Sequence, residues 1–375
     1  MLGRREVVAA AVAALMAGLA VVVLVGLGDA EVVEVRVQGG LPAAPVEAGQ
    51  VVWAEKGDIW IYDTESDKRR ALTTDGAARY DFKPHFRNQS RVTYLTSGEA
   101  FGPDPALVEI DLISGQRRTL QHLPGFIRAY DWNPDGIRLA YYNVLSYDAK
   151  TELHITGAGP SHLRRFAAIK GRGGFINYDE TRIEWASDGR RLLLSDTALD
   201  TSQDETLYIL DVDGSDAAAP RVGSWARWSA DGRAVYCHCA TTPAQNDWRW
   251  QAIDVAGGLS RPLLIPAAAR PSLSPDGRLL AFDDGADTPS IFVIDLAGTG
   301  AQPRFLARAA IAPLWLDPSR LAVTDTRPCP DSEDDCLAGG HGSMFEPAGT
   351  ASALDLHTGR RTPLPPIPTD GADTP

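Results

Sequence analysis

Two kinds of apolar segment alternate along most of this chain, and polar turns separate them. The first kind has a large apolar residue, a polar turn that often contains Asp-Gly, and then an apolar run, as in "DWNPDGIRLAYYN" (131–143) and "SLSPDGRLLAFDD" (272–284). Six copies follow one another in steps of about 42 to 53 residues. The large apolar residue at their second position is Phe86, Trp132, Trp185, Trp228, Leu273 or Trp315.

The second kind of segment lies between copies of the first. It is a short run rich in β-branched residues that often ends in Asp, followed by a Gly or Ser turn and another run. Examples are "DIWIYDTESDKRRALT" (58–73) and "SIFVIDLAGTGAQPRF" (290–305), and seven such units occur. This pattern is typical of a β-hairpin.

Together the two segments predict a repeated sheet of four strands, which we label A to D. In the A–B turns, Pro sets the first dihedral and Gly tolerates the positive φ of a tight turn. One such sheet cannot bury both of its faces, whereas a ring of sheets buries them all. We therefore expect an all-β fold, a β-propeller of four-stranded blades, with tryptophans packed between neighbouring blades.

The repeats "WNPDGIRLAYYN", "WASDGRRLLL", "WSADGRAVY" and "LSPDGRLLAF" resemble those of TolB-like propellers, also called WD40-like or PD40 repeats. The resemblance covers residues 51–365 and concerns the fold more than the function, because the family includes translocation proteins, peptidase propellers and anchored proteins of unknown role. It implies six blades, whereas the hairpins number seven. Residues 31–37 could supply an inner strand for a seventh blade; otherwise residues 51–73 complete the last of six.

The first thirty residues differ from the rest. Residues 7–28 contain no charged side chain, and Arg4 and Arg5 precede them. Such a segment is long enough to span a bilayer with its arginines in the cytoplasm. We favour an uncleaved membrane anchor; a cleaved signal peptide and a twin-arginine signal are the alternatives. Each interpretation places the propeller (51–365) outside the cytoplasm, after a linker at 31–50 and before a disordered tail at 366–375.

The charge of the chain narrows the choice of partners. Its formal net charge is −13, with 23% charged and 44% hydrophobic residues. Because proteins bind nucleic acid phosphates through Lys and Arg, nucleic acid is not an expected partner. The sequence leaves the oligomeric state open.

The variable lengths fall in the B–C and D–A connections, which open on the same face of a propeller. Long connections gathered on one face mark it as the expected binding face. Aromatic and arginine side chains make effective anchors in interfaces. The candidate contact residues on this face are Tyr147, Arg172, Phe175, Tyr178, Trp248, His341 and Phe345.

The four cysteines form two close pairs. Cys329 and Cys336 bracket "PDSEDD" in a long connection, and outside the cytoplasm we expect them to form a disulfide. Cys237 and Cys239 lie two apart on a strand, so both thiols point to the same face. We interpret this second pair as buried free cysteines. A disulfide between them or a metal site with a histidine remains an alternative.

No catalytic motif stands out. The chain has no G-x-S-x-G, no P-loop and no dinucleotide fingerprint. "DVDGSD" (211–216) is expected to be a hairpin turn and the acidic residues of 196–205 a solvated loop, rather than calcium sites. We therefore expect no enzyme, cofactor or metal, but an anchored scaffold that binds an envelope protein, peptide or glycan. The alternative is a hydrolase or lyase with acidic residues in the central funnel.

Overall fold

The computed structural model describes residues 49–76, 78–145, 151–157, 162–165, 181–196, 206–240, 248–266, 270–286, 288–297, 301–328 and 345–365. The chain divides into two units, residues 1–44 and 45–375, and all described residues belong to the second. Within them the regular elements are strands in antiparallel sheets. No helix long and apolar enough to cross a membrane occurs among these residues.

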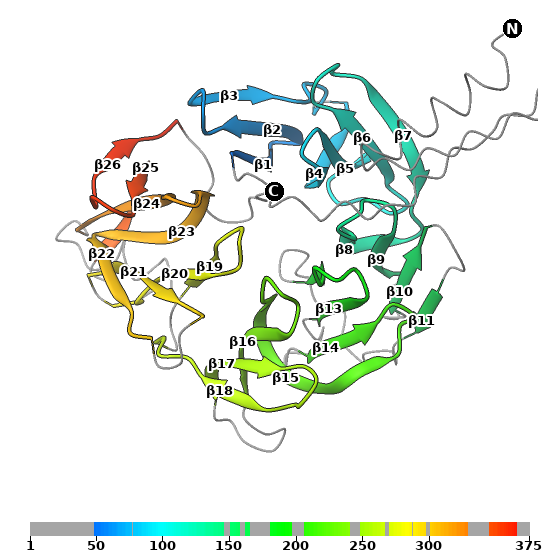
Figure 1. Ribbon diagram of the computed structural model, residues 1–375. Coiled ribbons are helices and arrows are strands. Elements are labelled where there is room, and N and C mark those ends of the chain that lie inside the picture. Colours follow the sequence, from blue (N-terminus) through cyan, green and yellow to red (C-terminus); the bar gives the residue numbers. More distant parts are fainter. Residues whose placement is uncertain are drawn as a thin grey trace, which may run out of the picture. The chain divides into compact units, whose positions relative to one another are not determined.

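The strands form seven blades around a central axis (Figure 1). Blade 1 contains β1 (Gln50–Glu55), β2 (Asp58–Asp63) and β3 (Lys68–Ala71). Blade 2 contains β4 (Tyr80–Asn88), β5 (Arg91–Ser97), β6 (Ala106–Asp111) and β7 (Arg117–His122). Blade 3 contains β8 (Phe126–Trp132), β9 (Leu139–Val144), β10 (Thr151–Thr156) and β11 (His162–Arg165).

Blades 4 and 5 share one long strand, β15 (Asp216–Trp228). Blade 4 also contains β12 (Arg182–Trp185), β13 (Arg191–Asp196) and β14 (Thr206–Asp211). Blade 5 also contains β16 (Ala234–Ala240), β17 (Trp248–Asp254) and β18 (Ser260–Pro262). Blade 6 contains β19 (Arg270–Leu273), β20 (Leu279–Asp283), β21 (Ser290–Asp295) and β22 (Arg304–Arg308). Blade 7 contains β23 (Ala310–Asp317), β24 (Arg320–Pro328), β25 (Phe345–Asp355) and β26 (Arg361–Pro363).

The apolar core consists of seven clusters, one between each pair of neighbouring blades. The cluster that closes the ring joins Val51 and Trp53 of blade 1 to Leu316 of blade 7. Arg320 of blade 7 adds a hydrogen bond of 2.9 Å from its Nη2 to the carbonyl oxygen of Thr64. Because blade 7 has its own four strands, β1–β3 form a separate blade and the count of seven is confirmed.

The A–B turns have the conformation that their Asp-Gly pairs predict. Gly136 and Gly277 have φ of +67° and +64°, where a side chain would be strained. In blade 6, the Ser274 hydroxyl accepts a hydrogen bond of 2.8 Å from the Leu279 amide across the turn. The repeated polar residue before the turn therefore closes it.

The Asp that ends many C strands has a similar local role. Asp111 Oδ1 accepts hydrogen bonds from the amides of Ile113 and Ser114, and Asp355 does the same for the turn that follows it. "DVDGSD" is also such a turn, since the Gly214 amide donates to the Asp211 carbonyl. The prediction of a hairpin turn there is confirmed.

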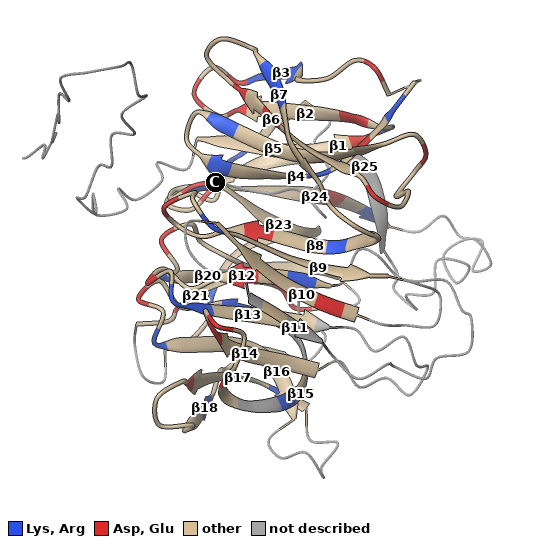
Figure 2. Ribbon diagram, turned by 90° about the vertical axis from the view of Figure 1, so that its right-hand side faces the viewer, with Lys and Arg blue, Asp and Glu red and all other residues tan. Residues whose placement is uncertain are grey.

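The tryptophans lie between blades, as expected. Trp185, Trp228 and Trp315 are at most 5% exposed, and each belongs to a core cluster that spans two blades. Their indole Nε1 atoms donate to backbone carbonyls one blade earlier, at Asp131, Glu184 and Ser272 respectively. In side view, acidic and basic residues are interspersed over the blades rather than separated by sign (Figure 2).

One expectation needs correction. Cys237 and Cys239 are joined by a disulfide, with their Cα atoms 5.6 Å apart, so the interpretation as free cysteines is wrong. Alternation along β16 places both thiols on the same buried face, next to each other. The D–A connections vary in length, and the one from blade 4 to blade 5 has no loop, because β15 runs directly from one blade into the other.

Candidate functional site

The structure locates only part of the predicted binding face. Tyr147, Arg172, Phe175, Tyr178 and His341 lie outside the described residues, as do Cys329 and Cys336.

Trp248 and Phe345 are the two predicted contact residues in described strands. Trp248 begins β17 in blade 5; it is half-buried, with its ring centroid 5.4 Å from that of His238. Phe345 begins β25 in blade 7 and pairs with Pro328 in the ladder. Blades 5 and 7 are not neighbours, so the structure does not bring these two residues together.

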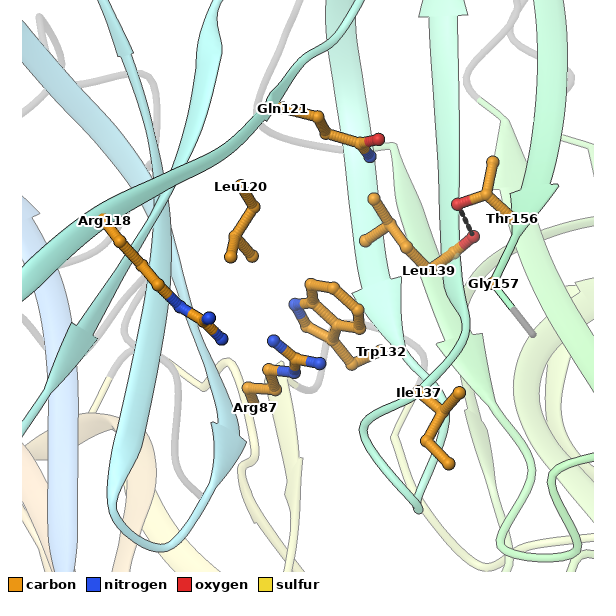
Figure 3. Close-up of a pocket in the computed structure, with 9 residues that line it drawn as sticks. All are labelled: Arg87, Arg118, Leu120, Gln121, Trp132, Ile137, Leu139, Thr156 and Gly157. Carbon is orange, nitrogen blue, oxygen red and sulfur yellow. Dashed lines mark hydrogen bonds between the residues drawn. The ribbon is translucent and has the colours of Figure 1, made fainter. Parts of the chain in front are cut away.

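A groove between blades 2 and 3 has the clearest recognition chemistry among the described residues. Its volume is about 360 Å³. Figure 3 shows the guanidinium groups of Arg87 and Arg118 reaching toward it from blade 2, with the Trp132 indole beside Arg87. The lining residues are Arg87, Arg118, Leu120, Gln121, Trp132, Ile137, Leu139, Thr156 and Gly157.

Glu109 orders the two arginines of this groove. Its side chain is only 3% exposed, and it accepts from Arg87 Nη1 at 2.7 Å and from Arg118 Nε at 2.8 Å. Burial works to raise the pKa of Glu109, but the hydrogen bonds from Arg118 and Arg87 outweigh it and hold the pKa below its ordinary value. The carboxylate therefore stays ionised and keeps both guanidinium groups in place.

The two arginines have different freedom to bind a ligand. Arg87 is committed to the fold, because its Nε donates to the Gly136 carbonyl and its Cζ lies 4.2 Å from the centroid of the Trp132 ring. Arg118 has a side chain 61% exposed. With exposed Gln121 it offers donors above the apolar surface of Leu120 and Ile137. This combination can bind an anionic or carbonyl-rich ligand that also has apolar groups.

A cluster of three aspartates lies on a different face, at the junction of blades 1 and 2. Asp58, Asp75 and Asp81 each place a carboxylate oxygen within 4.8 Å of the other two. Asp58 begins β2, Asp75 lies in the connection from β3 to β4, and Asp81 is the second residue of β4. These are the B–C turn and the D–A connection, so the cluster lies on the side where the long connections open.

Backbone contacts hold the three segments of this cluster together. The Asp81 amide donates to the Gly57 carbonyl at 2.9 Å, and the Gly76 amide donates to Asp58 Oδ1 at 2.9 Å. A Cβ on Gly76 would lie 2.9 Å from the carbonyl oxygen of Lys56, so the two loops are packed too closely for a side chain. Burial raises the pKa of Asp81, and the neighbouring Asp75 adds to that rise.

Three acidic groups, two on the inner strands β8 and β12 and one on β20, make hydrogen bonds within the fold. Asp131 Oδ2 accepts from the Trp185 amide at 2.9 Å, and Glu184 Oε1 accepts from the Trp228 amide at 3.4 Å. Asp283 Oδ2 accepts from the Ala312 amide at 3.1 Å. These three carboxylates therefore bind backbone amides of the next blade.

Neither the groove nor the aspartate cluster was anticipated from the sequence. Arg118 and Trp132 belong to different repeat units, and the three aspartates sit on both sides of a hairpin. The only sequence signals were the doubled arginine in "GQRRT" and an unusual density of Asp around "TTDGAARYDF". Either signal alone is typical of a solvated surface.

No family model and no curated protein matches the chain. Solved structures do match. A prolyl endopeptidase has a TM-score of 0.54 at 14% identity, over 88% of this chain and 49% of the other. A protein of unknown function from Desulfotomaculum acetoxidans has a TM-score of 0.52 at 12% identity, over 87% and 98%. Oligogalacturonate lyase in complex with manganese has a TM-score of 0.52 at 14% identity, over 74% and 83%.

TolB from Acinetobacter baumannii also matches, with a TM-score of 0.43 at 17% identity over 67% of this chain. This chain spans 62% of the length of that TolB chain and about half of the prolyl endopeptidase. The prediction of a β-propeller fold is confirmed by the blades and by the matches with TM-scores above 0.5. At these identities the comparisons establish the fold alone.

Proposed function

We propose that this chain is a binding scaffold of the cell envelope, held outside the cytoplasm by residues 1–30, that binds a protein, peptide or glycan. The observation that carries the proposal is the groove between blades 2 and 3, which is lined by exposed Arg118 and by the Trp132 indole. Guanidinium and indole groups together bind carboxylates and the faces of sugar rings or peptide side chains. The preferred ligand is an acidic peptide segment or an acidic oligosaccharide.

The first experiment measures binding of the purified full chain to arrays of acidic oligosaccharides and acidic peptides. Arg118→Ala combined with Gln121→Ala removes the exposed donors of the groove. We expect this variant to lose at least tenfold in affinity, since each charge-assisted hydrogen bond contributes about 1.5–3 kcal/mol. Arg70→Ala is the matched control, because Arg70 is an exposed arginine on an outer strand, away from the groove.

Trp248→Ala tests the alternative position on the long-connection face. If this variant loses binding and the groove variant does not, the contact lies on that face and the groove assignment is wrong. A wild-type chain that binds no array member, and captures no partner by crosslinking in native membranes, would contradict the scaffold function itself.

The position outside the cytoplasm has a separate test. Protease added to intact spheroplasts should cleave the propeller if residues 1–30 anchor it externally, and should leave it intact if it is cytoplasmic. Cleavage after lysis serves as the control for accessibility of the sites.

An enzyme is the alternative function. The carboxylates of the inner strands count against the particular enzyme that the sequence suggested, a hydrolase or lyase with acidic residues in the central funnel. Asp131 and Glu184 accept backbone hydrogen bonds across blade junctions, so a funnel hydrolase would have to use groups with structural partners. The activity of the peptidases and the lyase belongs to those proteins. Turnover of a bound array ligand, detected by mass spectrometry, would favour the enzyme.

A further inference from the structure

We propose that Asp58, Asp75 and Asp81 form a binding site for a Ca²⁺-sized divalent cation at the junction of blades 1 and 2. This site is independent of the groove and of the proposed scaffold function. The cluster brings three carboxylate oxygens within 4.8 Å of one another. Ligands on one Ca²⁺ lie about 2.3–2.6 Å from the ion, so two ligands on opposite sides are separated by about 5 Å.

The most informative member of the cluster is Asp81. It is 1% exposed, and its Oδ2 has no hydrogen-bond partner. Its cross-strand neighbour Thr96 is 5% exposed, and the Thr96 and Thr73 hydroxyls act to lower the pKa of Asp81, but burial outweighs them. A buried carboxylate oxygen without a donor is unfavourable, because burial removes its water and supplies nothing in return. A bound cation supplies the missing partner.

The surroundings of the cluster do not neutralise it fully. Arg117 Nη1 lies 3.2 Å from Asp75 Oδ1, and its Nη2 donates to the Leu72 carbonyl at 2.8 Å. One arginine opposes three carboxylates, so a divalent ion would balance the remaining charge. Asp75 is exposed and Asp81 is buried, which gives the ion an entrance on one side and an enclosed end on the other.

The donor set selects the kind of ion. Carboxylate and hydroxyl oxygens suit Ca²⁺, Mg²⁺ and Mn²⁺, whereas zinc sites usually include Cys or His. Calcium accepts irregular geometry and water ligands, and the site has an open side. We therefore assign calcium, with water completing its coordination shell.

The ion would stabilise the contact between blades 1 and 2. Blade 1 has three strands among the described residues, and the cluster joins its β1–β2 turn to the inner strand of blade 2. An ion held by residues of both blades stabilises the folded state only, since the unfolded chain does not assemble the site.

The test is calcium titration of the full chain after EDTA treatment, followed by calorimetry and by Tb³⁺ luminescence excited through tyrosine. Wild type should bind one ion and melt at a higher temperature with calcium. Asp58→Asn and Asp81→Asn should each weaken binding at least tenfold. Glu65→Gln is the matched control, because Glu65 is an exposed acid of the same blade and should behave as wild type.

Folding of the variants is checked in EDTA. Asp81→Asn should melt no lower than wild type there, because the substitution removes a buried charge. Equal calcium responses in wild type and Asp81→Asn would overturn the proposal, as would a folded wild type that does not respond. Binding of Mg²⁺ or Mn²⁺ without Ca²⁺ would overturn the assignment to calcium.

Discussion

The indole Nε1 of Trp315 donates a hydrogen bond of 2.9 Å to the carbonyl oxygen of Ser272, one blade earlier in the ring. Trp315 is 0% exposed and packs in the cluster between blades 6 and 7. The bond therefore connects two sheets that share no strand. The same arrangement recurs at Trp185 and Trp228, so the repeated tryptophan specifies how adjacent blades are spaced.

Trp315→Phe should lower the free energy of unfolding by about 1–3 kcal/mol, because it removes the indole donor of the interblade hydrogen bond and leaves a small cavity, while most of the apolar contact remains. Urea unfolding measures the change. Trp248→Phe is the control, since Trp248 is half-buried and has no indole hydrogen bond to another blade among the described contacts. Equal effects of the two substitutions would show that the interblade bond contributes nothing.

Glu109→Gln should lower the free energy of unfolding near pH 7, and this loss should become smaller as the pH falls. The folded pKa of Glu109 lies below its ordinary value of about 4.5, so its stabilising contribution is present above that value and is lost as the pH drops through the folded pKa. We expect a loss of about 1.5–3 kcal/mol at pH 7, because Arg87 and Arg118 lose an ionised acceptor.

Urea unfolding of wild type and Glu109→Gln at pH 7, 5 and below 4 checks this expectation. The difference between their free energies of unfolding should become smaller as the pH falls. A difference that is constant over this range would contradict ionisation of Glu109 as its source. Glu65→Gln, which removes an exposed acid, should show little difference at any of these pH values.

Gly277→Ala should destabilise the protein more than Gly115→Ala. Both glycines have positive φ, +64° and +70°, so both substitutions introduce the same backbone strain. A Cβ on Gly277 would lie 2.7 Å from the Cβ of Ala230, which is in the A–B turn of the neighbouring blade 5. A Cβ on Gly115 would have no atom within 4 Å. The additional loss of about 1–3 kcal/mol measures the close approach of the two turns. Thermal or urea unfolding of the two variants gives the comparison, and equal losses would mean that the turns separate easily.

Much of the blade architecture could be predicted because its determinants are local. The Asp-Gly turns and the Asp that closes many of the hairpins act within a few residues of themselves. The continuity of β15 could not be predicted, since Pro220 and Gly223 read as a loop. In the structure Pro220 falls between Ala218 and Arg221, where the pairing with β14 is irregular.

Gly223 and the two candidate sites depend on contacts between distant segments. A Cβ on Gly223 would collide with that of Cys239 in β16, so the glycine permits close packing rather than a turn. Asp58 and Asp81 meet only because the β3–β4 connection folds back onto the Gly57 turn. Arg118 and Trp132 line one groove only because blades 2 and 3 pack against each other. Repeat patterns describe each blade but not the surfaces that form between blades.

The shared strand β15 couples blades 4 and 5 mechanically, because one strand belongs to both sheets. At the junction of blades 6 and 7, by contrast, the two sheets are separate, although only Ala309, with φ of +53°, lies between β22 and β23. At β15 the ladder of one sheet continues directly into the next. A hinge or an inserted domain has no loop to occupy at that junction, and a chain divided there would have its two new ends inside a hydrogen-bonded strand. Split or circularly permuted forms should therefore tolerate a cut at other blade junctions far better than one within β15.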